Sequence, residues 1–259
     1  MGAAAAPASP GWIPSLAFQV LFYALTAVLA VAYLPLLALP RRWLVAAGRA
    51  WCRASLWLLR ATVGLDHAAR GEANRPAGPA IYAFKHQSAW DTLVVPILVA
   101  DPAIVLKREL LWVPLFGQYL WRCGMIAVDR RAGAAALRRM VAGARAAAAA
   151  GRPIVVFPEG TRRPVGAPPA YQPGVAALYA ALGLPVVPVA LNAGVFWSRR
   201  AFRKRPGRIT VSFLPAIPPG LDRRAFAARL AGAIEAETAQ LVAHALEQNK
   251  NIDPGGDPP

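Results

Sequence analysis

A histidine and an aspartate lie within one short polar segment, Lys85 to Asp91, which directly follows the apolar run Ile81 to Phe84. The apolar run predicts a strand, and the apolar residues after Asp91 predict the start of a helix. A carboxylate in the first helical turn can fold back onto His86, and an imidazole oriented by a carboxylate is a general base. The spacing from Ser88 to Asp91 also fits a helix capping box, so a capped helix beside an exposed histidine is the alternative.

A second polar turn, Phe157-Pro158-Glu159-Gly160-Thr161-Arg162, ends another apolar run further along the chain. The planar guanidinium of Arg162 is suited to bind a phosphate through two hydrogen bonds. Gly160 lets the backbone approach an anion, and Thr161 adds a hydroxyl or amide donor. The alternative is a plain strand-terminating turn, in which Pro158 and Gly160 serve only to end the strand.

Alternating strands and helices are the elements that have to hold these two turns. Apolar runs predict strands near residues 79–84, 103–107, 124–128, 153–157, 185–191 and 208–213. Helical patterns fall near residues 88–99, 109–121, 132–150, 173–182 and 222–248. Alternation of this kind predicts an α/β fold, a sheet covered by helices.

The composition indicates a membrane-associated chain with an anionic partner. Of 259 residues 56% are hydrophobic, and the mean hydropathy is +0.38, which is high for a soluble domain. The formal net charge of +16 favours lipid headgroups, nucleic acid or an acidic carrier protein. Cys52 and Cys123 form neither a disulfide framework nor a metal motif, so we expect no metal ion. A general base and an anion site in such a chain indicate chemistry on a phosphorylated lipid.

The N-terminal region predicts membrane helices. Residues 1–14 are small and rich in proline and alanine, and we expect them to be disordered. The stretch from Ser15 to Leu39 lacks charge and exceeds the roughly 20 residues needed to span hydrocarbon. Arg41 and Arg42 then predict that the rest of the chain is cytoplasmic. A re-entrant helix in one leaflet is the alternative, because Pro35 interrupts the stretch.

Residues 41–63 predict a second, amphipathic helix in which arginines alternate with tryptophans. Such a helix suits an anionic bilayer surface, and a helix packed on the core with a solvated arginine face is the alternative. We therefore expect membrane-anchoring helices over residues 15–64, a catalytic domain over 65–248 and a disordered tail over 249–259. The basic run from Arg199 to Arg205 is expected to be a solvated loop, a contact with anionic lipid or a contact with an acidic carrier protein.

The order and spacing of these blocks resemble the 1-acyl-sn-glycerol-3-phosphate (lysophosphatidic acid) acyltransferase family, of the bacterial glycerolipid acyltransferase type. The family's first block is Asn-His-x4-Asp, and here Lys85 replaces the asparagine. The block from Phe157 to Arg162 matches in full. The pair Asp129-Arg130 and the apolar stretch Val186 to Asn192 resemble two further blocks. The resemblance covers roughly residues 80–215 and implies a central mixed sheet flanked by helices.

The resemblance implies transfer of an acyl group from acyl-ACP or acyl-CoA to the sn-2 hydroxyl of 1-acyl-glycerol-3-phosphate, giving phosphatidic acid in phospholipid biosynthesis. His86 and Asp91 would be catalytic, with the substrate hydroxyl as the nucleophile and no cofactor besides the thioester co-substrate. The substrate-binding residues would be Glu159, Gly160, Thr161, Arg162, Arg130 and Lys107. Glu159 would bind the glycerol hydroxyl, and Lys85 would add positive charge beside the base.

Two alternatives stay open. A related enzyme would acylate another lysolipid, such as a lyso-ornithine lipid. A basic membrane protein that binds nucleic acid would explain the charge but not the two polar turns. Our leading interpretation is an acyltransferase of the cell inner membrane, with its site facing the cytoplasm, membrane lipid around it and no nucleic acid partner.

Overall fold

The computed structural model describes residues 11–252, with side-chain burial up to residue 248. Residues 1–10 and 253–259 lie outside the described residues, and so does most of the disorder expected at the two termini. The first helix, α1 (Trp12–Ala32), begins before the expected boundary at residue 15. The last helix, α8 (Arg223–Ile252), continues beyond the expected boundary at residue 248.

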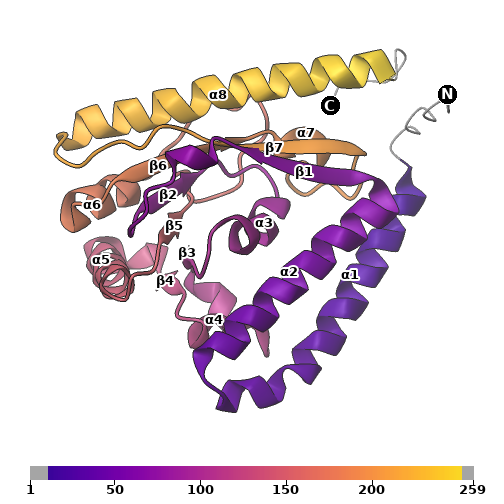
Figure 1. Cartoon of the computed structure of the whole chain (residues 1–259), viewed down its shortest axis with the longest axis horizontal. Helices are drawn as coiled ribbons and strands as arrows, with labels where there is room; N and C mark the ends of the chain where they lie inside the picture. The colour runs from indigo at the N-terminus through magenta and orange to yellow at the C-terminus, as the bar shows by residue number, and fades with distance from the viewer. Residues whose placement is uncertain (1–10, 253–259) are drawn as a thin grey trace.

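A seven-stranded mixed sheet forms the centre of the molecule, in the order β1-β7-β6-β2-β5-β3-β4 (Figure 1). The strands are β1 (Leu65–Arg70), β2 (Ile81–Phe84), β3 (Ala103–Lys107), β4 (Ile126–Val128), β5 (Ile154–Val156), β6 (Val186–Leu191) and β7 (Gly207–Phe213). All neighbours pair in parallel except β6 and β7, which are antiparallel. The predicted α/β class and mixed sheet are confirmed.

Strand β1 is not among the strands expected from the sequence. In the structure β1 pairs in parallel with β7, from Leu65 opposite Gly207 onward. The ring of His67 packs edge-on against Trp90, with centroids 5.6 Å apart. Burial lowers the pKa of His67, against the opposing effect of Asp66. The strand was missed because this polar segment becomes a strand only through a partner distant in sequence.

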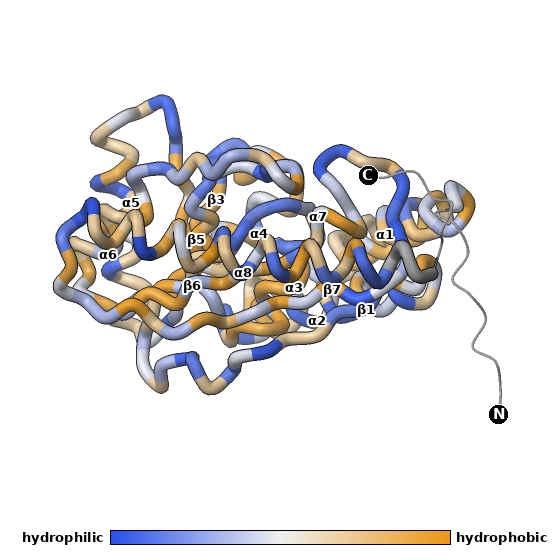
Figure 2. Tube along the Cα trace, turned by 90° about the horizontal axis from the view of Figure 1, so that it is seen from above, coloured by the Kyte–Doolittle hydropathy of each residue, from blue (hydrophilic) through white to orange (hydrophobic). Residues whose placement is uncertain are grey.

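Helices cover both faces of the sheet. Besides α1 and α8 they are α2 (Arg41–Val63), α3 (Trp90–Leu98), α4 (Phe116–Arg122), α5 (Gly133–Ala149), α6 (Pro173–Leu182) and α7 (Ala193–Phe196). Among the described residues, four 3-10 segments accompany them: η1 (Leu34–Ala38), η2 (Glu72–Asn74), η3 (Arg108–Trp112) and η4 (Arg130–Ala132). One apolar core lies against α1–α3 and the other against α5, α6 and the first half of α8. Figure 2 shows hydrophobic residues running along β6 through the middle of the molecule.

The helix predicted for residues 109–121 is divided into η3 and α4. Pro114 lacks an amide hydrogen, and Leu115 adopts a φ of 61°, which an α-helix does not tolerate. A Cβ on Gly117 would lie 2.0 Å from the carbonyl oxygen of Leu111, so the two segments pack backbone against backbone. The break therefore has a local cause in proline and glycine.

The N-terminal helices α1 and α2 form a hairpin whose two arms lie side by side (Figure 1). The apolar stretch ends as a helix at Ala32 and turns through η1, so it is not one helix from Ser15 to Leu39. Trp51 Nε1 donates to Thr26 Oγ1 at 3.0 Å, which ties the arms together. Helix α1 has 21 residues and is long and apolar enough to cross a membrane, which suggests membrane association.

The hairpin shares its core with the catalytic domain. Phe18 of α1 and Leu59 of α2 are fully buried in the cluster that contains the strand residues Tyr82 and Phe84. The expected boundary at residue 64 therefore does not separate two independent cores. The other face of α2 exposes Trp43 and Trp57, in keeping with the interfacial interpretation of that face.

The loop before β7 also differs from expectation. Lys204, placed by sequence in a solvated basic run, is only 1% exposed. Its ammonium lies 4.7 Å from the ring of Trp197 and 5.3 Å from that of Phe18, and it donates to Gln19 Oε1 at 3.1 Å. Its backbone N–H donates to Ser15 Oγ at 2.9 Å. Lys204 thus holds α1 against the loop before β7 and is not solvated.

Candidate active site

Four parallel strands end at one edge of the sheet, and the predicted site residues follow these ends. The strands β2, β5, β3 and β4 are consecutive neighbours. His86 follows β2, Arg162 follows β5, Lys107 ends β3 and Arg130 follows β4. Because the carboxyl ends of parallel strands meet at the same edge, residues far apart in sequence converge there.

The histidine and the aspartate form the expected pair. His86 Nδ1 lies 2.9 Å from Asp91 Oδ2, and the aspartate is fully buried. The same oxygen accepts the backbone N–H groups of Gln87 at 2.7 Å and Ser88 at 2.8 Å. The Ser88 hydroxyl accepts from Trp90 N at 3.2 Å, while the N-cap position of α3 is Ala89 and has no side-chain cap. The carboxylate is therefore held in place before any substrate binds.

The His86 ring faces the large cavity described below. It stacks on Phe157 at a centroid distance of 4.1 Å, and its side chain is 12% exposed. With Asp91 as the acceptor, Nδ1 carries the hydrogen and Nε2 is the basic nitrogen. The backbone N–H of Arg163 donates to the His86 carbonyl at 2.8 Å, which joins the two polar turns.

Glu159 does not face the cavity. Its side chain is fully buried, and Oε1 lies 2.9 Å from the Lys85 ammonium. Oε2 accepts the backbone N–H of His86 at 3.1 Å. Because both oxygens are engaged inside the protein, the geometry does not support the expected contact with a substrate hydroxyl. Glu159 instead fixes the backbone of His86.

Lys85 likewise differs from expectation, because two carboxylates offset its charge. Besides Glu159, its ammonium contacts Glu235 of α8, with Nζ–Oε1 and Nζ–Oε2 distances of 2.7 and 2.9 Å. The sequence analysis missed Glu235. The signal that could have found it is its place in the sequence. Glu235 directly follows Ile234, which lies on the buried stripe of α8, and the chain has only 13 acidic residues.

Basic side chains occupy the other side of the site. Arg130, Thr161 and Arg162 line the same cavity as His86, and Lys107 lies at its exposed rim. Gly160 adopts a φ of 64°, and a Cβ there would lie 3.6 Å from the Arg130 guanidinium. Partial burial lowers the pKa of Arg130, and Glu109 opposes this. Within residues 11–252 the guanidinium groups of Arg130 and Arg162 form no hydrogen bond or ion pair, which leaves their donors for a ligand.

The cavity that these groups share has a volume of about 1420 Å³ and a mainly apolar lining. It extends from the two polar turns to the hairpin, where Tyr23, Leu44 and Cys52 contribute to its wall. Burial raises the pKa of the Cys52 thiol to about 12. The cavity exceeds the roughly 300–1,000 Å³ of ordinary small-molecule sites, and its lining suits an acyl chain.

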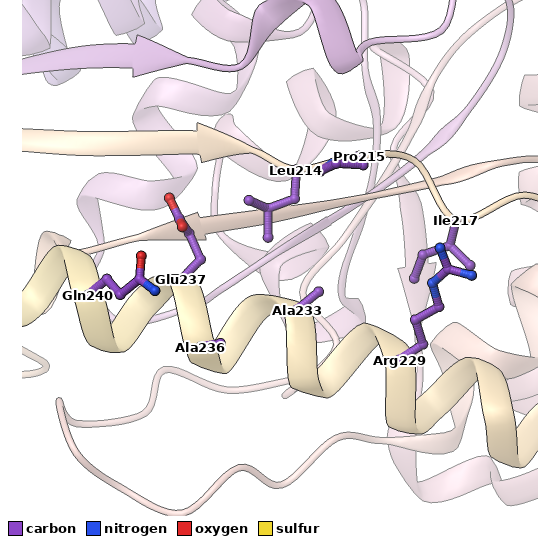
Figure 3. Close-up of a pocket in the computed structure, with 8 residues that line it drawn as sticks. All are labelled: Leu214, Pro215, Ile217, Arg229, Ala233, Ala236, Glu237 and Gln240. Carbon is purple, nitrogen blue, oxygen red and sulfur yellow. The ribbon is translucent and has the colours of Figure 1, made fainter.

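A smaller hollow of about 320 Å³ lies between α8 and the segment after β7 (Figure 3). Its walls include Leu214, Ile217 and Ala233, and Glu237 at its edge bonds to Arg70. None of the predicted site residues lines it. Among residues 11–252 no group of three or more His, Cys, Asp or Glu side chains is arranged to hold a metal ion.

Comparisons with known proteins agree with this arrangement. A family model described as acyltransferase matches residues 67–192. The 1-acyl-sn-glycerol-3-phosphate acyltransferase of Pseudomonas aeruginosa is 40% identical over 167 residues, which cover 64% of this chain and 65% of that protein. The enzyme of the same name from Salmonella typhimurium is 31% identical over 181 residues, which cover 66% of this chain and 73% of that protein. The matched part thus spans just under two thirds of the Pseudomonas protein.

A solved structure shares the fold. The 1-acyl-sn-glycerophosphate (LPA) acyltransferase PlsC from Thermotoga maritima aligns with a TM-score of 0.72 and 19% identity, over 88% of this chain and 95% of that one. The family model spans the two polar turns that hold His86 and Arg162. Together with the identity to the Salmonella protein, this match shows that the chain belongs to the 1-acyl-sn-glycerol-3-phosphate acyltransferase family.

Proposed function

We propose that this protein transfers an acyl group from an acyl thioester to the sn-2 hydroxyl of 1-acyl-glycerol-3-phosphate, giving phosphatidic acid. The observation that carries the proposal is a single cavity that holds both an oriented histidine and two arginines whose guanidinium groups have no partner among residues 11–252. A base beside an anion site is what acylation of a phosphorylated alcohol requires. The relatives named above as 1-acyl-sn-glycerol-3-phosphate acyltransferases support the same substrate.

His86 acts as the general base. Its Nε2 takes the proton of the substrate hydroxyl as the oxygen attacks the thioester carbonyl carbon. The carbon–sulfur bond then breaks, and the proton passes from the imidazolium to the thiolate. Asp91 holds the ring in the required tautomer and stabilises the imidazolium. Since the substrate supplies the nucleophile, no enzyme-bound acyl intermediate forms.

The arginines position the acceptor. Arg162 and Arg130 bind the phosphate beside Gly160, whose missing side chain lets the phosphate approach the backbone. Lys107 adds charge at the rim of the cavity. Fixing the phosphate places the glycerol hydroxyl near His86, and such positioning supplies much of the rate enhancement. The apolar part of the cavity accommodates an acyl chain.

Membrane attachment brings the protein to its lipid substrate. The apolar face of α1 and the exposed tryptophans of α2 insert into the bilayer, and the basic excess of the chain favours its anionic surface. We place the protein at the cell inner membrane with its site on the cytoplasmic side, where acyl-ACP and acyl-CoA are available. Both donors remain candidates.

The test is a direct assay of product formation. Purified protein in mixed micelles is given 1-acyl-glycerol-3-phosphate, other lysophospholipids or a lyso-ornithine lipid, each with acyl-CoA or acyl-ACP, and the products are identified by mass. We expect phosphatidic acid as the main product. If a lysolipid without a phosphate monoester is acylated preferentially, that lysolipid replaces 1-acyl-glycerol-3-phosphate as the proposed acceptor. Salt-sensitive DNA binding without acyl transfer would replace the function itself.

A further inference from the structure

A buried charged cluster joins the two catalytic turns to α8. It consists of Lys85 after β2, Glu159 after β5, Glu235 of α8 and Tyr171 from the loop that precedes α6. The Lys85 ammonium bridges the two carboxylates at 2.7–2.9 Å. Tyr171 donates its hydroxyl to Glu235 Oε1 at 2.9 Å. The cluster therefore contains one cation, two carboxylates and one neutral donor.

The alternation of β2 directs Lys85 and His86 to opposite sides. Ile81 and Ala83 belong to the core under α5, α6 and α8, whereas Tyr82 and Phe84 belong to the core against α1–α3. Continuing this period of two, the side chain after Phe84 points to α8 and the next one points to the cavity. The cluster thus lies behind the catalytic histidine and does not line the cavity.

Burial makes the pairing of Lys85 necessary. The residue is 2% exposed, and a buried ammonium is tolerated only when it is paired and hydrogen-bonded. One partner, Glu159, uses its second oxygen to hold the backbone N–H of His86 at 3.1 Å. The other partner, Glu235, approaches from α8 and has a side chain that is 27% exposed. Any displacement of the ammonium is therefore passed through Glu159 to His86.

We propose that Lys85 and Glu235 form a positioning pair for the proposed acyl transfer. Through Glu159 the pair sets the backbone position of His86, and through Tyr171 it attaches the loop after Arg162 to α8. The pair takes the place of the asparagine in the first block that the chain otherwise resembles. Lys85 and Glu235 thus compensate each other's charge, so the loss of either residue leaves the other without its partner. This inference rests on the proposed function for its activity readout.

Tyr171 links the pair to the acceptor side of the site. Burial, together with the Glu235 carboxylate, raises the pKa of the Tyr171 hydroxyl, so it remains a protonated donor at neutral pH. The next residue, Gln172, donates its N–H to the Pro158 carbonyl at 2.8 Å. A Cβ on Gly160 would lie 3.3 Å from the Gln172 side chain. The end of this loop is therefore packed on the turn that carries Arg162.

The experiment is a double-mutant cycle on kcat and KM, with Lys85→Asn, Glu235→Gln and the double variant. Lys85→Asn leaves two carboxylates without their cation, and we expect kcat to fall about 10- to 100-fold, the effect of misplacing a reacting group. KM for the thioester should change little, because neither residue lines the cavity. In the double variant kcat should exceed that of Lys85→Asn by at least about threefold, because coupled residues are not additive.

Glu237→Gln is the matched control. Glu237 lies on the same helix and pairs with Arg70 on the outer surface, so its loss should leave kcat unchanged. If Lys85→Asn does not fold, Glu235→Gln carries the test alone, and it should lower kcat while Glu237→Gln does not. The proposal is overturned if the fall in kcat of the double variant equals the product of the falls in the two single variants. It is also overturned by an unchanged kcat in Lys85→Asn.

A readout independent of catalysis separates this inference from the proposed function. Carbethoxylation of His86 is followed by peptide mass, with the exposed His244 as the internal reference. We expect Lys85→Asn and Glu235→Gln to raise the rate at His86 relative to His244, because the ring loses its fixed position against Asp91 and Phe157. If the wild-type protein has no acyltransferase activity but the two variants still show the faster reaction at His86, the proposed function is refuted and the positioning pair is retained. An unchanged ratio in both variants would refute the pair.

Discussion

The two sides of the cavity differ in how their polar groups are held. On the base side, His86, Asp91 and Glu159 bond to one another's side chains or backbones, and both carboxylates are fully buried. On the anion side, Arg130 and Arg162 form no hydrogen bond within residues 11–252 and are partly or largely exposed. One side is pre-organised by the fold, whereas the other offers donors that a ligand has to order.

This difference follows from what each side does in the proposed reaction. A base has to lie within hydrogen-bond reach of the proton that it removes, so rigidity on that side favours catalysis. Charged donors that bonded internally would compete with the phosphate. We therefore expect changes on the base side to lower kcat and changes on the anion side to raise KM for the acceptor.

The largest effect is expected for His86→Ala. Loss of the general base should lower kcat by about 10²–10⁴-fold, while the thermal unfolding midpoint changes little because Asp91 keeps two backbone partners. Steady-state kinetics and differential scanning calorimetry measure the two quantities. His244→Ala, at an exposed position of α8, is the control and should be fully active. A folded His86→Ala protein with full turnover would show that the base lies elsewhere.

Asp91→Ala should affect both activity and stability. Asp91 Oδ2 accepts one imidazole and two backbone N–H groups. Each buried donor left without a partner costs about 1–3 kcal/mol. We expect a large loss of kcat together with a lower free energy of unfolding, measured by urea titration. Equal stability of Asp91→Ala and His86→Ala would contradict the role of the carboxylate in holding the turn.

Arg162→Ala tests the anion side. Removing a charged hydrogen-bond partner costs about 1.5–3 kcal/mol, so KM for the lysophosphatidic acid acceptor should rise roughly 10–150-fold in steady-state assays. KM for the thioester should change much less. Arg162→Lys should recover only part of the loss, since an ammonium lacks the planar fork.

Arg163→Ala is the neighbouring control for this prediction. The Arg163 side chain donates to the Pro168 carbonyl at 3.0 Å and does not line the cavity. The KM of the Arg163→Ala variant for the lysophosphatidic acid acceptor should equal that of the wild type. If Arg162→Ala also leaves the acceptor KM unchanged, the phosphate assignment is wrong, and an acceptor without a phosphate monoester becomes the leading candidate.

The smallest effect is expected at Lys204, a buried cation outside both sides of the cavity. Burial lowers its pKa from the ordinary value of 10.5. The folded state therefore binds fewer protons than the unfolded state between the lowered pKa and 10.5, and stability rises with pH in that window. Relative to Lys204→Met, the wild type should gain stability as the pH rises toward 10.5, measured by urea titration. The two proteins should have the same kcat. A difference in stability that is independent of pH would contradict this account.

The sequence by itself determined most of the sheet and the identity of the chemical groups. Apolar runs bounded by proline and glycine placed β2 through β7 within a few residues, because a strand buried on both faces has to be continuously apolar. The pairing of His86 with Asp91 was also predictable. Both residues belong to one strand–turn–helix unit, so their distance depends on local geometry.

Only the tertiary structure decided which groups meet across elements. Strand β1 is polar and forms through its pairing with β7, so no local pattern identifies it. Lys204 belongs to a run of arginines that predicts a solvated loop, yet packing against α1 buries it. Burial of a single side chain depends on a neighbour from a distant part of the chain, and sequence spacing does not record that neighbour.

The same reason explains the roles of Glu159 and Lys85. From the sequence, Glu159 was expected to bind the glycerol hydroxyl of the substrate, and Lys85 was expected to add positive charge beside His86. The alternation of β2 and the position of α8 instead bring Lys85, Glu159 and Glu235 together behind the catalytic turn. Sequence identifies residues able to carry charge. Their partners, and hence the charge that acts in the site, are set by which side of the sheet each residue faces and which helix covers that side.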